Sequence, residues 1–244
     1  MTEEKVCLVV GAGDATGAAI ARKFAQEGYT VCVVRRKRHL DSLEDLVGEI
    51  KSKGGRGHAF GIDAREEEQV IELFESIETG IGKIDVAVFN IGANVWFPIA
   101  ETTARVFEKV WQMGCFAGFL TGREAARRMT PRKQGTIFFT GATASVRGSA
   151  HFSAFASAKH GLRALAQSMA RELGPQGIHV AHLIVDGAID TPWIRENFPG
   201  KFKDPTPDTV LRPEDIADAY WMLHIQKPSG WTHELDMRPW VEKW

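Results

Sequence analysis

The sequence predicts an α/β fold, a doubly wound parallel sheet of about seven strands with helices on both faces, built as one domain over residues 1–244. Two observations carry this prediction. Short β-branched runs alternate with longer segments of helical periodicity, and a glycine-rich turn joins the first run to the first helix. Repeated alternation of this kind implies right-handed crossovers between parallel strands. No linker, repeat or low-complexity segment divides the chain, so a single unit is expected.

The expected strands are short apolar runs, and the first, residues 6–10, is continuous, as in a strand buried on both faces. Further strands are expected at 30–34, 59–62, 84–89, 136–140 and 179–185, and a last one in the alternating segment 230–240. Helices are expected where apolar residues recur every three or four positions. These segments are 18–27, 43–50, 70–77, 103–129 and 152–173.

Composition bounds the class of protein. The 244 residues are 44% hydrophobic and 25% charged, with a net charge of -1, so one large core can form and neither nucleic acid nor an anionic membrane is expected as a partner. The cysteines Cys7, Cys32 and Cys115 are odd in number and far apart, which is typical of reduced thiols in a cytosolic protein. Without a signal pattern or an apolar run near the ~18 residues of a membrane span, we expect a soluble, cytoplasmic protein.

The glycine-rich turn that follows the first strand is the first candidate binding site. It contains Gly11, Gly13 and Gly17, and a helix begins directly after it. Small residues allow the main chain to approach a pyrophosphate, which then lies at the N-terminus of the helix. Glycines also serve turns that bind nothing, but the position in the first strand-helix connection favours a dinucleotide.

Two arginines, Arg35 and Arg36, end the second strand about twenty residues after this turn. An acidic residue near this place favours NAD, whereas arginine suits the 2'-phosphate of NADP. No carboxylate occurs between Thr30 and Leu40, so NADP(H) is preferred over NAD(H). Asp14, inside the turn, argues mildly in the other direction.

Six segments, in order and at the right spacing, resemble motifs of the classical short-chain dehydrogenase/reductase (SDR) family. They are residues 11–17 (for T-G-x-x-x-G-x-G), 63–64 (the aspartate at the adenine ring), 89–92 (N-N-A-G), 155–159 (Y-x-x-x-K), 186–191 (P-G-x-x-x-T) and 212–217 (the start of the next helix). The resemblance covers nearly the whole chain and implies a Rossmann fold that binds a nicotinamide dinucleotide.

The resemblance also implies which residues contact the cofactor. They are Gly11, Gly13, Asp14, Ala15, Thr16, Gly17, Arg35, Arg36, Asp63, Ala64, Asn90, Gly92, Lys159, Gly187, Ile189 and Thr191.

For catalysis, the resemblance implies a tetrad of asparagine, serine, tyrosine and lysine, and this chain departs from it at three positions. The tyrosine position is Phe155, the serine position thirteen residues earlier is Ala142, and the asparagine position is Gly114. Only Lys159 is retained, with an expected role in binding the nicotinamide ribose. Phenylalanine has no proton to donate, and general acid-base help is typically worth about 10² to 10⁴ in rate. An atypical member of the family is therefore expected.

Three side chains near Phe155 in the sequence are candidates for part of the role of the missing phenol. His151 lies four residues before Phe155 and is a substitute acid if the helix already includes it, although a histidine at a helix start is more often a solvated or capping residue. Thr140 and Thr143 could orient a substrate, but neither is acidic enough to replace a phenol. No spacing of histidines and carboxylates indicates a metal site.

Two functions stay open. The first is an NADP(H)-dependent oxidoreductase that transfers hydride to a small carbonyl or imine-like substrate without the usual tyrosine acid. The second is a catalytically inactive dinucleotide-binding pseudoenzyme that acts as a sensor or assembly subunit. The family commonly forms homodimers or homotetramers, and the apolar residues Leu162, Leu165 and Met169 of the segment 152–173 are an expected interface.

Overall fold

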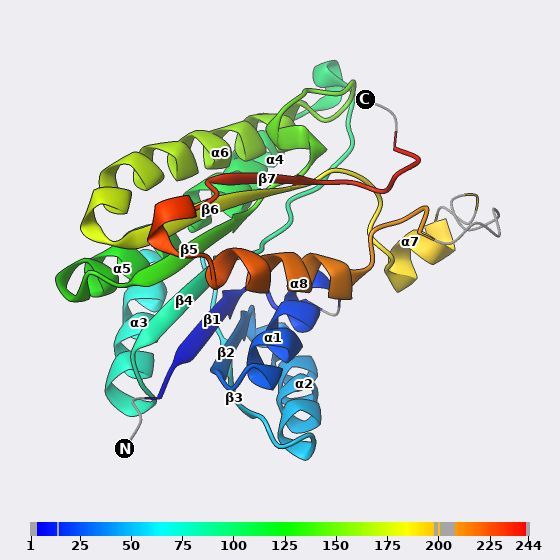
Figure 1. Cartoon of the computed structure of the whole chain (residues 1–244). Coiled ribbons are helices and arrows are strands. Elements are labelled where there is room, and N and C mark those ends of the chain that lie inside the picture. Colours follow the sequence, from blue (N-terminus) through cyan, green and yellow to red (C-terminus); the bar gives the residue numbers. More distant parts are fainter. Residues whose placement is uncertain (1–3, 14, 198–199, 201–207, 243–244) are drawn as a thin grey trace.

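Seven parallel strands form one sheet in the computed structural model, which describes residues 4–13, 15–197, 200 and 208–242 (Figure 1). The strand order is β3-β2-β1-β4-β5-β6-β7. The strands are β1 (Val6–Val10), β2 (Thr30–Arg35), β3 (Arg56–Gly61), β4 (Ile84–Phe89), β5 (Gly135–Thr140), β6 (Ile178–Val185) and β7 (Glu234–Met237). The predicted doubly wound sheet is therefore confirmed, and its direction of winding reverses between β1 and β4.

Helices cover both faces of this sheet (Figure 1). They are α1 (Thr16–Gln26), α2 (Leu40–Ser52), α3 (Glu67–Gly80), α4 (Ala104–Trp111), α5 (Ala117–Met129), α6 (Ser153–Leu173), α7 (Pro192–Asn197) and α8 (Pro213–His224). One hydrophobic cluster joins the sheet to α1, α2 and α8, and a second joins its other face to α3, α5 and α6.

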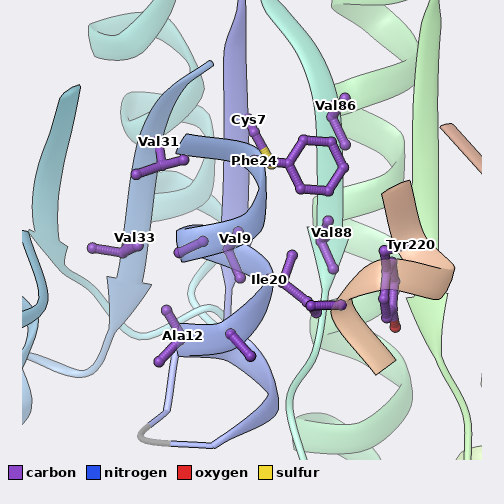
Figure 2. Packing of buried hydrophobic residues seen from close by; sticks show 14 of the residues in the cluster. Cys7, Val9, Ala12, Ile20, Phe24, Val31, Val33, Val86, Val88 and Tyr220 are labelled. Carbon is purple, nitrogen blue, oxygen red and sulfur yellow. The ribbon is translucent and has the colours of Figure 1, made fainter. Parts of the chain in front are cut away.

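The strand side chains alternate between these two clusters, as the period of two in a β-strand requires. Cys7 and Val9 of β1 face the first cluster, where Figure 2 shows Cys7 beside Phe24 of α1. Leu8 and Val10 face the second cluster. All four side chains are almost fully buried, which explains why β1 has a continuous apolar sequence and not an alternating one.

Two predicted elements differ from the observed ones. Strand β3 begins at Arg56, before the predicted segment 59–62. The apolar pattern did not indicate its first residues because this edge strand is half-exposed and they do not form an apolar run. The predicted helix over 103–129 is interrupted by a π-helical turn, η3 (Gln112–Phe116), between α4 and α5. Such turns insert one residue into a helix and often occur at functional sites.

The interface expected on α6 stays a prediction, but one of its three residues lies in the core. Leu162 is fully buried, and Leu165 and Met169 pack against the second core cluster, because this side of α6 covers the sheet. Exposed aromatic residues lie instead on α4 and α5, where Phe107 and Phe119 keep 38% and 37% of their surface exposed. Among the described residues, no helix combines the length and apolar character needed to cross a membrane.

Two buried histidines link the last elements to the sheet. The ring of His224 in α8 contacts the hydroxyls of Tyr29 at 2.6 Å and Thr136 at 2.9 Å. His182 in β6 lies 3.0 Å from Glu234 of β7, which also binds Arg163 of α6 through two hydrogen bonds. Burial lowers the pKa of both histidines to about 4.

These histidines predict a loss of stability in mild acid. The folded state holds both rings neutral, whereas the unfolded chain takes up protons near the usual pKa of about 6.5. Their contribution to stability is therefore complete above about pH 6.5 and is lost as the pH falls toward 4. Between pH 7 and pH 5, we expect the free energy of unfolding to fall by roughly 2 kcal/mol for each ring.

Urea unfolding of the wild type and of a His182→Gln/His224→Gln variant, at both pH values, measures this loss. The variant should be less stable at pH 7 but should lose much less between pH 7 and pH 5. Carboxylates with a lowered pKa, such as Glu49 and Glu234, titrate below this window and do not contribute. A wild-type protein that is equally stable at both pH values would contradict the prediction.

Candidate functional site

A cavity of about 890 Å³ lies at the carboxyl ends of the strands, where the winding of the sheet reverses. Cofactor and ligand sites in sheets of this kind are found at this place, and their volumes are typically roughly 300 to 1,000 Å³. The lining residues come mainly from the segments that follow six of the strands, β1 to β6. Among the predicted cofactor residues, the cavity is lined by Gly11, Gly13, Ala15, Thr16, Gly17, Arg35, Arg36, Asp63, Ala64, Asn90, Gly92, Lys159, Gly187, Ile189 and Thr191. Asp14 lies outside the described residues.

The glycine-rich turn is packed so closely that two of its glycines cannot carry a side chain. Gly11 has a φ of 97°, and a Cβ there would lie 2.7 Å from the carbonyl of Asn90. A Cβ at Gly17 would lie 2.4 Å from the carbonyl oxygen of Gly11. The side-chain amide of Asn90 donates a hydrogen bond of 3.0 Å to that same oxygen, which ties the segment after β4 to the turn. The turn thus presents main chain, not side chains, to the cavity.

Positive charge collects where β2 and β3 end. The guanidinium of Arg35 lies beside Gly13, with its central carbon 4.0 Å from where a Cβ would be, and Arg36 follows it. Asp63 is bound by Arg65, and these hydrogen bonds hold the pKa of the Asp63 carboxyl below its usual range. Burial and the like charge of Arg38 lower the pKa of Arg36. Such crowding of cations indicates a place that an anion would stabilise.

Lys159 of α6 is buried at the other end of the cavity, with 3% of its surface exposed. Its ammonium donates to the main-chain carbonyls of Thr140 at 2.8 Å and Ile91 at 3.2 Å. Burial lowers the pKa of Lys159 to about 8. An ammonium has three N–H donors, so one remains for a ligand in the cavity.

Phe155 lies on the same side of α6, as the helical spacing predicts. Its half-buried ring lines the cavity, with its centre 5.9 Å from the Lys159 ammonium. Ala142 lines the cavity from the end of β5, and its main-chain N–H donates to the hydroxyl of Ser145 at 3.1 Å. Both side chains that face the cavity here are therefore apolar.

Gly114 does not reach the cavity. It is buried in the π-helical turn, and a Cβ there would lie 3.1 Å from the Cβ of Ala158 in α6 and 3.4 Å from that of Ala93. The close approach of η3 to α6 leaves little space for a larger side chain. Its neighbour Met113 lines the cavity in its place.

The two threonines considered as substrate-orienting groups both have partners. Thr143 lines the cavity, but its hydroxyl donates to the buried carboxylate of Asp186. The hydroxyl of Thr140 shares a hydrogen bond of 2.6 Å with Tyr220. Because Asp186 can only accept, the Thr143 proton is not available for a substrate oxygen.

His151 has no geometric support as a substitute acid. Helix α6 begins at Ser153, so the helical spacing between His151 and Phe155 on which that role depended does not exist. The residue is exposed, has a φ of 70°, and its ring lies 4.5 Å from that of Trp96. It is not among the residues that line the cavity.

Several cavity residues were missed by the sequence reasoning, and two carry charge. Arg65 lies two residues after Asp63, and Arg147 lies five residues after Ala142, so proximity to predicted site residues was the available signal. Others with polar or aromatic side chains include His39, Asn94, Ser149 and Phe152. Among the residues described, no group of three or more histidine, cysteine, aspartate or glutamate side chains could hold a metal ion.

Comparison with known proteins identifies the family. Residues 5–201 match the model of the short chain dehydrogenase family. The crystal structure of a short-chain dehydrogenase from Rhodopseudomonas palustris is 50% identical and superposes with a TM-score of 0.83 over 97% of this chain and 99% of that one. The uncharacterized oxidoreductase YxjF of Bacillus subtilis is 30% identical, with 94% of both chains covered.

More distant structures share the fold. A metagenomic short-chain oxidoreductase solved in complex with NADP is 24% identical, with a TM-score of 0.80 and 98% of both chains covered. A sequence identity this low shows only that the two proteins share a fold. The family match over residues 5–201 and the near relatives go further, and together they establish that this chain belongs to the short-chain dehydrogenase family.

Proposed function

We propose that the protein is an NADP(H)-dependent oxidoreductase that transfers hydride to a small carbonyl or imine-like substrate without a tyrosine acid. One observation carries this proposal: a single cavity with a volume of about 890 Å³ extends from the glycine-rich turn to Lys159 and Phe155. A protein that used only the adenine half of a dinucleotide would have no need of a buried lysine at the other half. The inactive pseudoenzyme is the alternative that the experiments below test.

The residues present fit a nicotinamide dinucleotide. Gly11 and Gly17 leave a cradle of main chain that a Cβ would fill, as a pyrophosphate at the N-terminus of α1 requires. Lys159 retains an N–H donor for the ribose hydroxyls. When bound, the cofactor supplies the hydride, and these residues bind and orient it.

The preference for NADP(H) over NAD(H) is supported by charge. Among the described residues that line the end of the cavity at β2 and β3 are three guanidinium groups, from Arg35, Arg36 and Arg65, and one carboxylate, Asp63, which Arg65 binds. A 2'-phosphate would place its charge near Arg35 and Arg36. The metagenomic oxidoreductase with bound NADP is consistent with this choice but too distant to carry it.

The tetrad is proposed to be degenerate, with Phe155, Ala142 and Gly114 at the tyrosine, serine and asparagine positions. Reduction of a carbonyl adds a hydride to carbon and a proton to oxygen, and no side chain at Phe155 or Ala142 can provide that proton. Water must supply it, or the substrate must carry it. A protonated imine needs only the hydride, which is why imine-like or activated carbonyl substrates are favoured.

We also propose that the protein forms a homodimer or homotetramer through α4 and α5. Phe107, Trp111 and Phe119 expose between 37% and 41% of their surfaces there. The ring of Trp111 stacks on that of Phe116, with centroids 6.0 Å apart, which adds a further aromatic ring to the patch. Burial against a second copy would remove this surface from water.

The first prediction concerns the cofactor. We expect NADPH to bind at least tenfold more tightly than NADH, because Arg35 and Arg36 would make charge-assisted hydrogen bonds worth about 1.5 to 3 kcal/mol each. An Arg35→Gln/Arg36→Gln variant should lose that preference, whereas Arg38→Gln, in the exposed loop beyond, should keep it. Titration calorimetry measures both affinities. Equal affinities for NADPH and NADH in the wild type would refute the preference.

The second prediction concerns the missing hydroxyls. A Phe155→Tyr/Ala142→Ser variant should reduce ordinary ketones with NADPH roughly 10² to 10⁴ faster than the wild type, because both new hydroxyls would face the cavity. Phe152→Tyr is the matched control, since it adds a phenol to the same cavity three residues away. If the rate does not rise, the shape of the cleft or the packing at Gly114 also prevents the chemistry.

Turnover itself separates the two functions. The protein is loaded with NADPH, mixed with a panel of carbonyl and imine compounds, and followed in a single turnover by the loss of nicotinamide absorbance. An enzyme should oxidise the bound NADPH with at least one compound of the panel, and faster than the buffer control. Tight binding of NADPH with no substrate-dependent oxidation would identify the pseudoenzyme.

A further inference from the structure

Arg147 is a cavity residue with no role in the function proposed so far. It lies in the loop between the short helix η5 (Thr143–Ser145) and α6. Ala142 directly precedes η5, and Phe155 is in the first turn of α6. The main-chain N–H of Arg147 donates to the carbonyl of Thr143 at 3.1 Å, so the base of the side chain is held by the loop. The side chain is 39% exposed and lines the same cavity as Phe155.

The guanidinium of Arg147 is positioned by a buried carboxylate. It lies 3.5 Å from Asp186, which is 3% exposed and also accepts from Thr143. Arg238, 14% exposed, approaches the second oxygen of Asp186 at 3.6 Å. Asp186 therefore keeps two partners even without Arg147. No hydrogen bond joins the Arg147 guanidinium to another described residue, so its N–H groups are available to a ligand.

The charge at this end of the cavity is positive. Asp63 is the one acidic residue among the described residues that line the cavity, and it follows β3. Ala142 follows β5, four strands away from β3 along the sheet, a separation of roughly 19 Å at the usual strand spacing. Near Phe155, the charged side chains that line the cavity are thus Arg147 and Lys159, both basic.

Few other donors remain for a substrate near Phe155. The hydroxyls of Thr143 and Thr140 are bound to Asp186 and Tyr220, and Lys159 uses two N–H groups on main-chain carbonyls. Arg147 offers a planar fork of N–H groups whose geometry matches a carboxylate.

We infer that Arg147 binds the carboxylate of the substrate, and that the substrate class is carbonyl or imine compounds that carry a carboxylate. This inference rests on the proposed function for the reacting group, but the carboxylate contact requires only that the NADPH-loaded cavity accept a ligand. Arg147 would hold one end of the substrate while Phe155 packs against its apolar part. Orientation of this kind replaces part of what the absent hydroxyls would supply.

The test compares two ligands that differ in the carboxylate alone, phenylpyruvate and its neutral counterpart phenylacetone. Binding to the NADPH-loaded protein is measured by the change in nicotinamide fluorescence, without any need for turnover. We expect phenylpyruvate to bind roughly ten- to hundredfold more tightly. Pyruvate and 2-oxobutyrate are included as smaller carboxylates. If none of the three carboxylates binds better than phenylacetone, the inference is wrong.

Variants assign the contact to Arg147. Arg147→Gln should abolish the preference for phenylpyruvate, and Arg147→Lys, which keeps the charge beside Asp186 but loses the fork, should retain only part of it. Arg171→Gln, on the exposed surface sixteen residues along α6 from Phe155, should change nothing. If Arg147 is only a counter-ion for Asp186, Arg147→Gln will lower the melting temperature and leave the preference intact, which would overturn the inference.

The two proposals fail in different ways. NADPH binding without oxidation by any compound would remove the proposed function, while the fluorescence of the NADPH-loaded protein would still test the carboxylate preference. Failure to bind NADPH would remove both proposals. Oxidation of NADPH by neutral substrates, with no effect of Arg147→Gln, would keep the enzyme and remove the inference.

Discussion

The buried ammonium of Lys159 holds the candidate site together. By donating to the carbonyls of Ile91 and Thr140, it attaches α6 to the ends of both β4 and β5. Phe155, one turn away on the same helix, and Ala142, just beyond Thr140, are thereby placed against one cavity. A cation that is 3% exposed is costly to bury unless it is hydrogen-bonded, so these two contacts are also what allows the lysine to lie there.

Around this lysine, the threonine hydroxyls form hydrogen bonds within the wall of the cavity and are not directed to a ligand. The groups that face a ligand at Phe155 and Ala142 are apolar, while the threonine hydroxyls bind Asp186 and Tyr220. The side chains of Phe155 and Ala142 can pack against a ligand but cannot give it a proton. The proposed chemistry, hydride transfer to a compound that needs little acid help and that Arg147 holds at its charged end, agrees with this arrangement.

Local patterns predicted most of the scaffold, and they failed where a side chain's partner lies far away in the sequence. The helical spacing expected between His151 and Phe155 does not exist, because α6 begins at Ser153. The apolar stripe with Leu162 could not show by itself that Leu162 lies in the core, since a stripe that faces a sheet and one that faces a second subunit look the same in a sequence. The π-helical turn around Gly114 had no signal in the periodicity.

The sequence by itself determined the order of strands and helices, the glycine-rich turn and the arginines that end β2, because periodicity, turn geometry and chain order act over a few neighbouring residues. Tertiary structure alone decided which polar groups a ligand can reach. Thr143 and Asp186 are 43 residues apart, and Thr140 and Tyr220 are 80 apart, yet these pairs determine which hydroxyls are available. Arg147 is a candidate for the same reason: its proposed role depends on a cavity lined by the segments that follow six strands.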